Sequence, residues 1–124
     1  MSIDFSLTPE LEAIRTRIRT FVDDVIRPGG AAIDGQGDTP ALDGEDRIRA
    51  LIGMRKQARE EGLWLPHMPT EWGGMGLGHV ELAMVQAEAA RSYYGPWVLN
   101  CQAPDEGNMH TLLHWATDAQ KEKY

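Results

Sequence analysis

The sequence has 124 residues, a net charge of −7 from 12 basic and 19 acidic side chains, and 42% hydrophobic residues. This is the length of one domain with an ordinary apolar fraction, and the acidic balance argues against binding to nucleic acid or to anionic membranes. The single cysteine excludes an internal disulfide, and no run reaches the roughly 18 apolar residues of a membrane span. With no signal-peptide pattern at its start, the sequence predicts a cytoplasmic protein.

The first predicted helix begins after Thr8, a favourable N-cap, with Pro9 in the first helical position. Its apolar side chains recur at steps of three and four, which places them on one face: Leu11, Ile14, Ile18, Phe21, Val22 and Val25. We expect the Pro-Gly-Gly at 28–30 to end this helix. Residues 29–45, which are rich in Gly, Asp and Pro, are expected to form a loop.

A second helix is predicted over residues 45–61, with Gly62 as its C-terminal stop. Its predicted buried face consists of Ile48, Leu51, Ile52 and Ala58. The short apolar run at 63–65 is cut by Pro66 and has no second strand to pair with, so no sheet is expected. Residues 66–78 carry two prolines and four glycines, which predicts a long irregular loop.

A third helix, over residues 79–91, is apolar around most of its circumference, which favours packing against something outside the chain. After a turn at 94–96, helical residues follow Pro104, and Thr117 with Gln120 has the spacing of a capping box that opens a last helix. The sequence therefore predicts an all-α, up-and-down domain of five or six helices with long loops.

The patterns that could carry chemistry are incomplete. The Gly-rich run at 73–78 lacks both a preceding strand and the Lys-Ser/Thr of a phosphate loop, which favours a simple turn into the next helix. His110 and His114 share a helix face, but no further ligand completes a metal site. Cys101 has apolar neighbours and no paired base, which indicates a buried structural thiol. The acidic pairs at 23–24 and 60–61 are typical of solvated helix ends, so we expect no catalytic set.

Several motifs then occur in register. Residues 69–77, PTEWGGMGL, resemble the P-x-E-[YW]-G-G-x-G-L loop of the acyl-CoA dehydrogenase family. Residues 5–10, FSLTPE, are similar to its opening F-x-L-[TS]-x-E, and residues 61–66 resemble its approach to the loop. Residues 117–124, TDAQKEKY, resemble T-[ED]-x-Q-K-x-x-[YW], although Ala116 replaces the usual preceding glycine. Residues 100–109, NCQAPDEGNM, are similar to the branch whose larger members carry a kinase-like domain and favour longer or hydroxylated acyl chains.

The resemblance implies the N-terminal helical domain of a three-domain enzyme, over residues 1–124, without the middle β domain and the C-terminal helical domain. It implies α,β-dehydrogenation of an acyl-CoA, in which a carboxylate base removes the α-proton and FAD accepts the β-hydride. The base and the flavin-binding motifs are absent here, so the chain alone is expected to be inactive, with no catalytic, cofactor-binding or metal-binding residue. Implied partners of the full-length enzyme are an electron-transferring flavoprotein and further subunits of a dimer or tetramer.

In the family, the helix after the 91–96 turn lines the distal end of the acyl tunnel. The resemblance therefore implies six substrate-binding residues: Trp97, Val98, Cys101, Gln102, Asp105 and Asn108. Bulk at Trp97 would shorten or redirect the tunnel, while an ordinary core role for this ring stays equally open. The alternative function is a non-catalytic helical interaction module, or a split subunit of a flavoenzyme.

Overall fold

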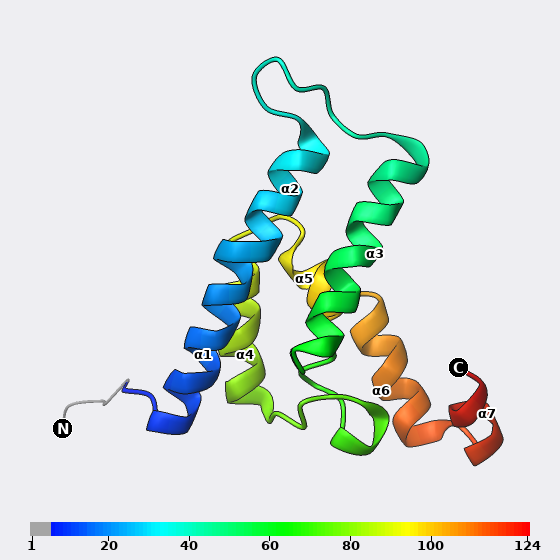
Figure 1. Cartoon of the computed structure of the whole chain (residues 1–124). Helices are drawn as coiled ribbons and strands as arrows, with labels where there is room; N and C mark the ends of the chain where they lie inside the picture. Colours follow the sequence, from blue (N-terminus) through cyan, green and yellow to red (C-terminus); the bar gives the residue numbers. More distant parts are fainter. Residues whose placement is uncertain (1–5) are drawn as a thin grey trace.

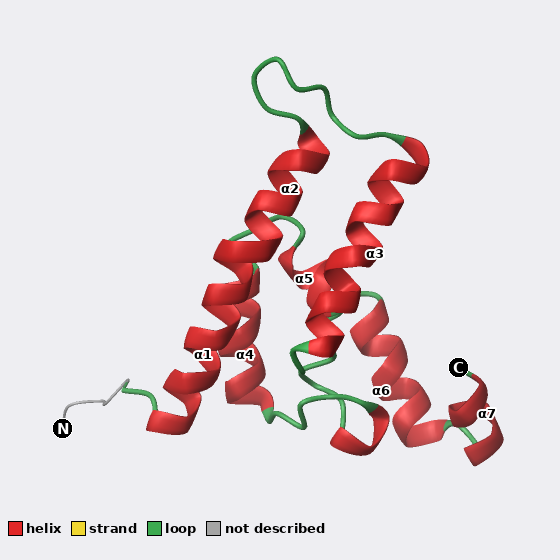
Figure 2. Cartoon of the chain, in the orientation of Figure 1, coloured by secondary structure: helices red, strands yellow, loops and turns green. Residues whose placement is uncertain are grey.

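The computed structural model describes residues 6–124, which form helices and loops with one isolated bridge between Gln36 and Thr39 (Figure 2). The all-α prediction is confirmed. No helix in this part of the chain is long and apolar enough to cross a membrane. The α-helices are α1 (Pro9–Phe21), α2 (Arg27–Asp34), α3 (Gly44–Glu60), α4 (His79–Ala89), α5 (Gly95–Leu99), α6 (Asp105–Trp115) and α7 (Asp118–Lys123).

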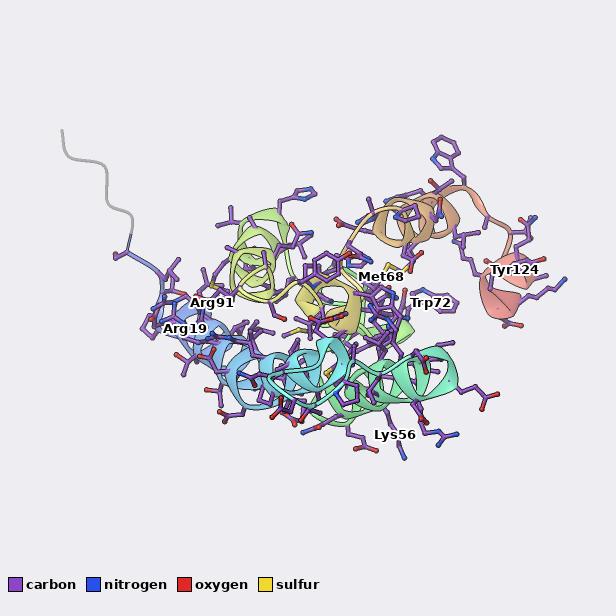
Figure 3. The ribbon with its side chains drawn as sticks, turned by 90° about the horizontal axis from the view of Figure 1, so that it is seen from above. Arg19, Lys56, Met68, Trp72, Arg91 and Tyr124 are labelled. Atoms are coloured by element: carbon purple, nitrogen blue, oxygen red, sulfur yellow. The ribbon has the colours of Figure 1, made fainter. Side chains whose placement is uncertain are left out.

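The helices form two layers. One layer holds α3 and the rod made by α1 and α2, which lie side by side and run in opposite directions (Figure 1). In the other layer α4 packs against α1, and the short α5 lies between α3 and α4 (Figure 3). The pair α6 and α7 extends to one side and carries the C-terminus (Figure 1). The core is therefore built mainly by α1 to α5.

The start of α1 and its buried face follow from local sequence. The side-chain oxygen of Thr8 accepts a hydrogen bond from the backbone N–H of Leu11 at 3.3 Å, as expected of an N-cap. Three residues predicted for this face are fully or almost fully buried: Ile18, Phe21 and Val22. Ile26, one turn after Val22, is also fully buried. This face is the centre of the core.

The prediction that this helix ends at residues 28–30 is wrong. A π-helical turn, Val22–Ile26, joins α1 to α2, and the chain stays helical through Pro28 as far as Asp34. The N–H of Arg27 donates to the carbonyl of Val22, so the hydrogen bonding shifts by one residue just before the proline. Pro28, which has no N–H to donate, follows this shift directly, in the first turn of α2. The loop begins at Gly35, whose φ of 79° suits glycine.

The buried face of α3 also differs from the prediction. Ile48 and Ile52 are each 56% exposed, while Met54 and Ala58 are buried and Leu51 is half-buried. Because α3 packs against α2 and α5, only the face turned toward those helices is covered. The helix does stop where predicted, at Gly62 with a φ of 69°.

One buried carboxylate holds α4 on α1. Glu88 is 6% exposed, and its carboxylate accepts hydrogen bonds from Arg19 Nε at 3.0 Å and Nη2 at 2.6 Å. Arg15 and Arg91 approach the same carboxylate at 3.6 and 3.7 Å. The hydrogen bonds from Arg19 lower the pKa of Glu88 below its ordinary value. In Figure 3, Arg19 and Arg91 lie together at this end of the molecule.

Part of the circumference of α4 is not covered by residues 6–124. Its buried residues are Leu82, Val85, Glu88 and Ala89, whereas Val80 is 69% exposed. One apolar part of α4, which includes Val80, therefore remains exposed. At the far end of α4 the chain turns sharply and Gly95 comes very close to the helix. A Cβ at this position would lie 1.9 Å from the carbonyl oxygen of Ala89.

Glu88→Gln is expected to lower the free energy of unfolding by about 1.5–3 kcal/mol at neutral pH, since it removes a charge-assisted pair from a buried position. The ionised form stabilises the fold fully above the ordinary pKa of 4.5, and this contribution is lost as pH falls through the lowered folded-state pKa. Urea unfolding at several pH values should therefore show the difference from the parent chain shrinking toward acid. In the control Glu60→Gln, an exposed pair with Lys56 is lost, and a change within about 0.5 kcal/mol is expected. An equal loss in both variants would contradict this role.

Gly95→Ala is expected to lower the free energy of unfolding by about 2–3 kcal/mol, because the new methyl group meets a backbone carbonyl that cannot rotate away. The matched control is Gly53→Ala in α3, where a Cβ has nothing within 4 Å. Alanine is the better helix former, so this control should stabilise the chain by about 1 kcal/mol. Chemical denaturation measures both changes, and a neutral Gly95→Ala would show that the turn can relax.

Candidate functional site

The short helix α5 sets the direction of the residues that the family resemblance selects. Asn100 ends the helix in a left-handed conformation with φ 55° and ψ 50°, and Cys101 N–H donates to the carbonyl of Pro96 at 2.9 Å. This tight return turns Val98 and Cys101 into the core, where they are 0% and 2% exposed. Trp97 stays half-buried at the edge of the core.

Two of the six predicted substrate residues share a hollow. Trp97 and Gln102 line a hollow of about 270 Å³, together with residues of α3 and of the turn after α4: Arg47, Leu51, Tyr93 and Tyr94. Asp105 is half-buried at the start of α6, and its charge acts on Arg55 of α3. Asn108 is exposed on α6. The structure therefore brings Trp97 and Gln102 together and places Val98 and Cys101 behind them in the core.

One end of this hollow is polar. The Tyr94 hydroxyl donates to Asp34 Oδ1 at 2.5 Å and accepts from Arg47 Nη2 at 3.2 Å. The hydrogen bond to Asp34 raises the pKa of Tyr94, so the ring keeps its proton. Sequence reasoning missed Arg47 and Leu51, although their four-residue spacing places them on one face of α3. The hollow therefore combines an apolar wall with a charged rim.

Cys101 is buried, as predicted. Burial raises the pKa of its thiol to about 12, which keeps it protonated and unreactive at neutral pH. Its backbone carbonyl accepts a hydrogen bond from Gln86 Nε2 at 2.9 Å, and the same amide donates to Glu106 Oε2 at 3.0 Å. Gln86 therefore ties α4 to the start of α6.

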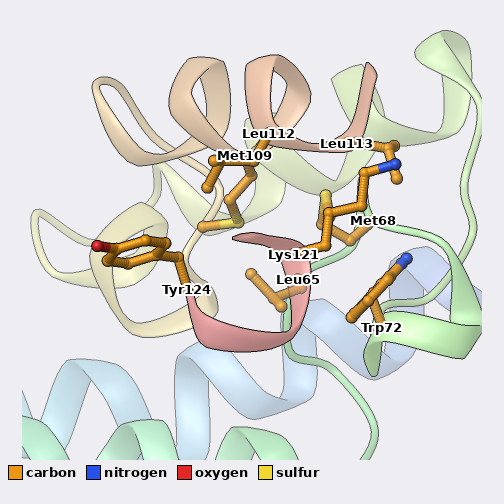
Figure 4. Close-up of a pocket in the computed structure, with 8 residues that line it drawn as sticks. All are labelled: Leu65, Met68, Trp72, Met109, Leu112, Leu113, Lys121 and Tyr124. Atoms are coloured by element: carbon orange, nitrogen blue, oxygen red, sulfur yellow. The ribbon is translucent and has the colours of Figure 1, made fainter. Parts of the chain in front are cut away.

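A second, apolar hollow of about 140 Å³ lies between the loop after α3 and the last two helices. Figure 4 shows its side chains converging from these elements: Leu65, Met68, Trp72, Met109, Leu112, Leu113, Lys121 and Tyr124. The capping box predicted for Thr117 and Gln120 is present and starts α7, which supplies Lys121. This hollow was not foreseen, because its walls come from three segments that are separate in sequence.

The Gly-rich loop is a folded turn and offers no phosphate cradle. Its backbone N–H groups donate to carbonyls of the preceding loop: Gly73 to Thr70, Gly74 to Pro69, Met75 to Leu65, Gly76 to Met68 and Leu77 to Pro66. A Cβ on Gly74 would lie 2.1 Å from the Met68 carbonyl oxygen, so the loop is closely packed on itself. The interpretation as a turn into α4 is confirmed.

Three of the four histidines have neighbouring rings. The rings of His110 and His114 stack at 6.3 Å, and the buried His67 lies 5.3 Å from His110. Burial lowers the pKa of His67, which favours its neutral form. Over residues 6–124, no group of three or more His, Cys, Asp or Glu side chains is arranged to hold a metal ion.

Comparison with known proteins places the chain in a family. Residues 8–124 match the model of the acyl-CoA dehydrogenase N-terminal domain. No solved structure gives a match. The chain is 35% identical to acyl-CoA dehydrogenase family member 11 of Rattus norvegicus over 91% of its own length and 14% of the relative's.

Two further relatives extend this similarity. Acyl-CoA dehydrogenase family member 10 of Mus musculus is 36% identical over 95% of this chain and 11% of the relative. The probable acyl-CoA dehydrogenase FadE2 of Mycobacterium tuberculosis is 27% identical over 98% of this chain and 30% of the relative. The chain thus spans less than a third of the length of these relatives. With nearly all of its residues matching that one domain model, the chain belongs to the acyl-CoA dehydrogenase family.

Proposed function

We propose that this chain is the N-terminal part of a flavin-dependent acyl-CoA dehydrogenase and forms part of the wall of its acyl tunnel. The observation that carries the proposal is that Trp97 and Gln102 line one hollow, beside the apolar side chain of Leu51. Family membership and the names of the relatives support the reaction class, α,β-dehydrogenation of an acyl-CoA thioester.

The six residues then have different parts in this wall. The ring of Trp97 limits the volume open to the acyl tail, and Gln102 supplies a polar contact beside it. Val98 and Cys101 pack behind the wall and keep it in place. We assign Asp105 and the exposed Asn108 to its rim, at the start of α6. Each methylene of substrate buried against such a wall contributes about 0.8 kcal/mol.

The Gly-rich loop does not fit the phosphates of FAD. Holding its phosphates would need free backbone N–H groups, and those of the Gly-rich loop already donate within the loop. Cys101 is buried and protonated, and Glu88 is paired with arginines, so neither is available as a base. We therefore assign the flavin and the catalytic carboxylate to parts of the enzyme outside this chain.

The exposed apolar surface agrees with a domain that packs on others. Val80 of α4 and Trp115 of α6 are 69% and 86% exposed, and Tyr124 is 78% exposed. We propose that these side chains contact the remaining domains of the enzyme. The electron-transferring flavoprotein and the further subunits of a dimer or tetramer would then bind surfaces that this chain contributes to only in part.

Trp97→Ala in the full-length enzyme tests the proposal. Opening the hollow should shift the preference toward longer acyl chains, by about fourfold in kcat/KM for each further methylene that becomes buried. The measurement is kcat/KM over a series of saturated acyl-CoA substrates. The control is Ile52→Ala, which removes an exposed apolar side chain of α3 that does not line this hollow. An unchanged chain-length profile in Trp97→Ala would remove Trp97 from the tunnel wall.

A further inference from the structure

An arginine of α3 holds the ring that lines the hollow. The guanidinium carbon of Arg55 lies 3.5 Å from the ring centroid of Trp97 and 5.1 Å from that of Trp64. Arg59, one turn further along α3, lies over the Trp64 ring at 4.3 Å. Two cations and two indole rings thus form one stack that joins α3 to α5 and to the loop between α3 and α4.

The same guanidinium also binds the backbone of α5. Arg55 donates from Nε and Nη2 to the Trp97 carbonyl at 3.1 and 2.9 Å, and from Nη2 to Asn100 Oδ1 at 3.4 Å. Asn100 is the left-handed residue that ends α5, so Arg55 contacts both the helix end and the ring within it. One arginine side chain therefore contacts both the left-handed end of α5 and the indole ring of Trp97.

The charges that face Arg55 are few. Burial lowers its pKa, with the nearby charge of Arg59 acting in the same direction and that of Asp105 opposing it. No direct carboxylate partner of Arg55 is present among the described residues, and its donors instead meet a carbonyl and an amide oxygen. The guanidinium therefore binds α5 and the residue that ends it, and not an acidic group. These contacts fix the position of α5 relative to α3.

We propose that Arg55 is a positioning residue, which fixes the Trp97 ring at the edge of the hollow and thereby sets the length of the acyl chain that the hollow accepts. This rests on the proposed function, because it takes the hollow as part of the acyl-binding wall. Arginine suits the task since its guanidinium is planar, stacks on indole and presents a rigid fork of donors to the carbonyl. Lysine carries the same charge on a compact ammonium and cannot do both at once.

The test uses the full-length enzyme with Arg55→Lys and Arg55→Met, each alone and combined with Trp97→Ala. We expect both single variants to shift the acyl-chain profile in the direction of Trp97→Ala, with KM for short substrates rising more than kcat falls. In the Trp97→Ala background the Arg55 substitutions should change the profile by less than they do in the parent enzyme, since the ring is gone and only the hydrogen bonds of Arg55 to α5 remain to be lost. Arg55→Lys keeps the charge and the long stem, so it provides a folded variant if Arg55→Met does not fold.

A spectroscopic measurement follows the position of the Trp97 ring separately from the acyl-chain preference. In enzyme labelled with 5-fluorotryptophan, the fluorine signal lost in Trp97→Phe belongs to Trp97, and Arg55→Lys should move or broaden it. Arg59→Met removes one of the two cations over Trp64 and leaves Arg55 between the two rings, so it should leave both that signal and the chain-length profile unchanged. An unmoved Trp97 signal, or an equal profile shift in the Trp97→Ala background, would overturn the role of Arg55. A moved signal with no profile change in Trp97→Ala itself would instead overturn the proposed function of the hollow.

Discussion

The buried carboxylate of Glu88 is the constraint on which the placement of the later helices depends. It lies on α4, and the arginine that binds it with two hydrogen bonds lies on α1. Arg15 and Arg19 remain partly exposed, so most of the cost of desolvation falls on the single acid. Because α4 is held there, its end determines where the chain turns at Gly95, and this turn directs α5.

The features predicted well from sequence are those that depend on neighbours along the chain. The caps at Thr8 and Thr117, the stop at Gly62 and the spacing of Ile18 and Phe21 all act within one or two helical turns. The residues that cause such features lie next to them in the sequence, so a pattern of a few residues is enough to identify them.

The predictions failed where the outcome depends on a distant element. A proline usually ends a helix, but at Pro28 the rod formed by α1 and α2 continues. A π-helical turn precedes this proline, and Gly30 packs closely against the Tyr94 ring. Likewise Ile48 and Ile52 are apolar at helical spacing, yet no other helix of the described chain covers them. In the candidate site, Trp97 and Gln102 follow from the resemblance, whereas Arg47 and Leu51 meet them only because α3 packs beside α5.

The contacts of Arg55 separate two properties of position 97. Its hydrogen bonds go to the backbone carbonyl, which every residue at that position presents, while its stacking contact is with the indole ring. The carbonyl contact therefore docks α5 on α3 whatever side chain stands there, and only the stacking contact depends on its volume. A smaller side chain at position 97 would enlarge the hollow and leave the helix end docked, whereas a change at position 55 alters both. The volume of this hollow can thus vary through one position without loss of the fold that supports it.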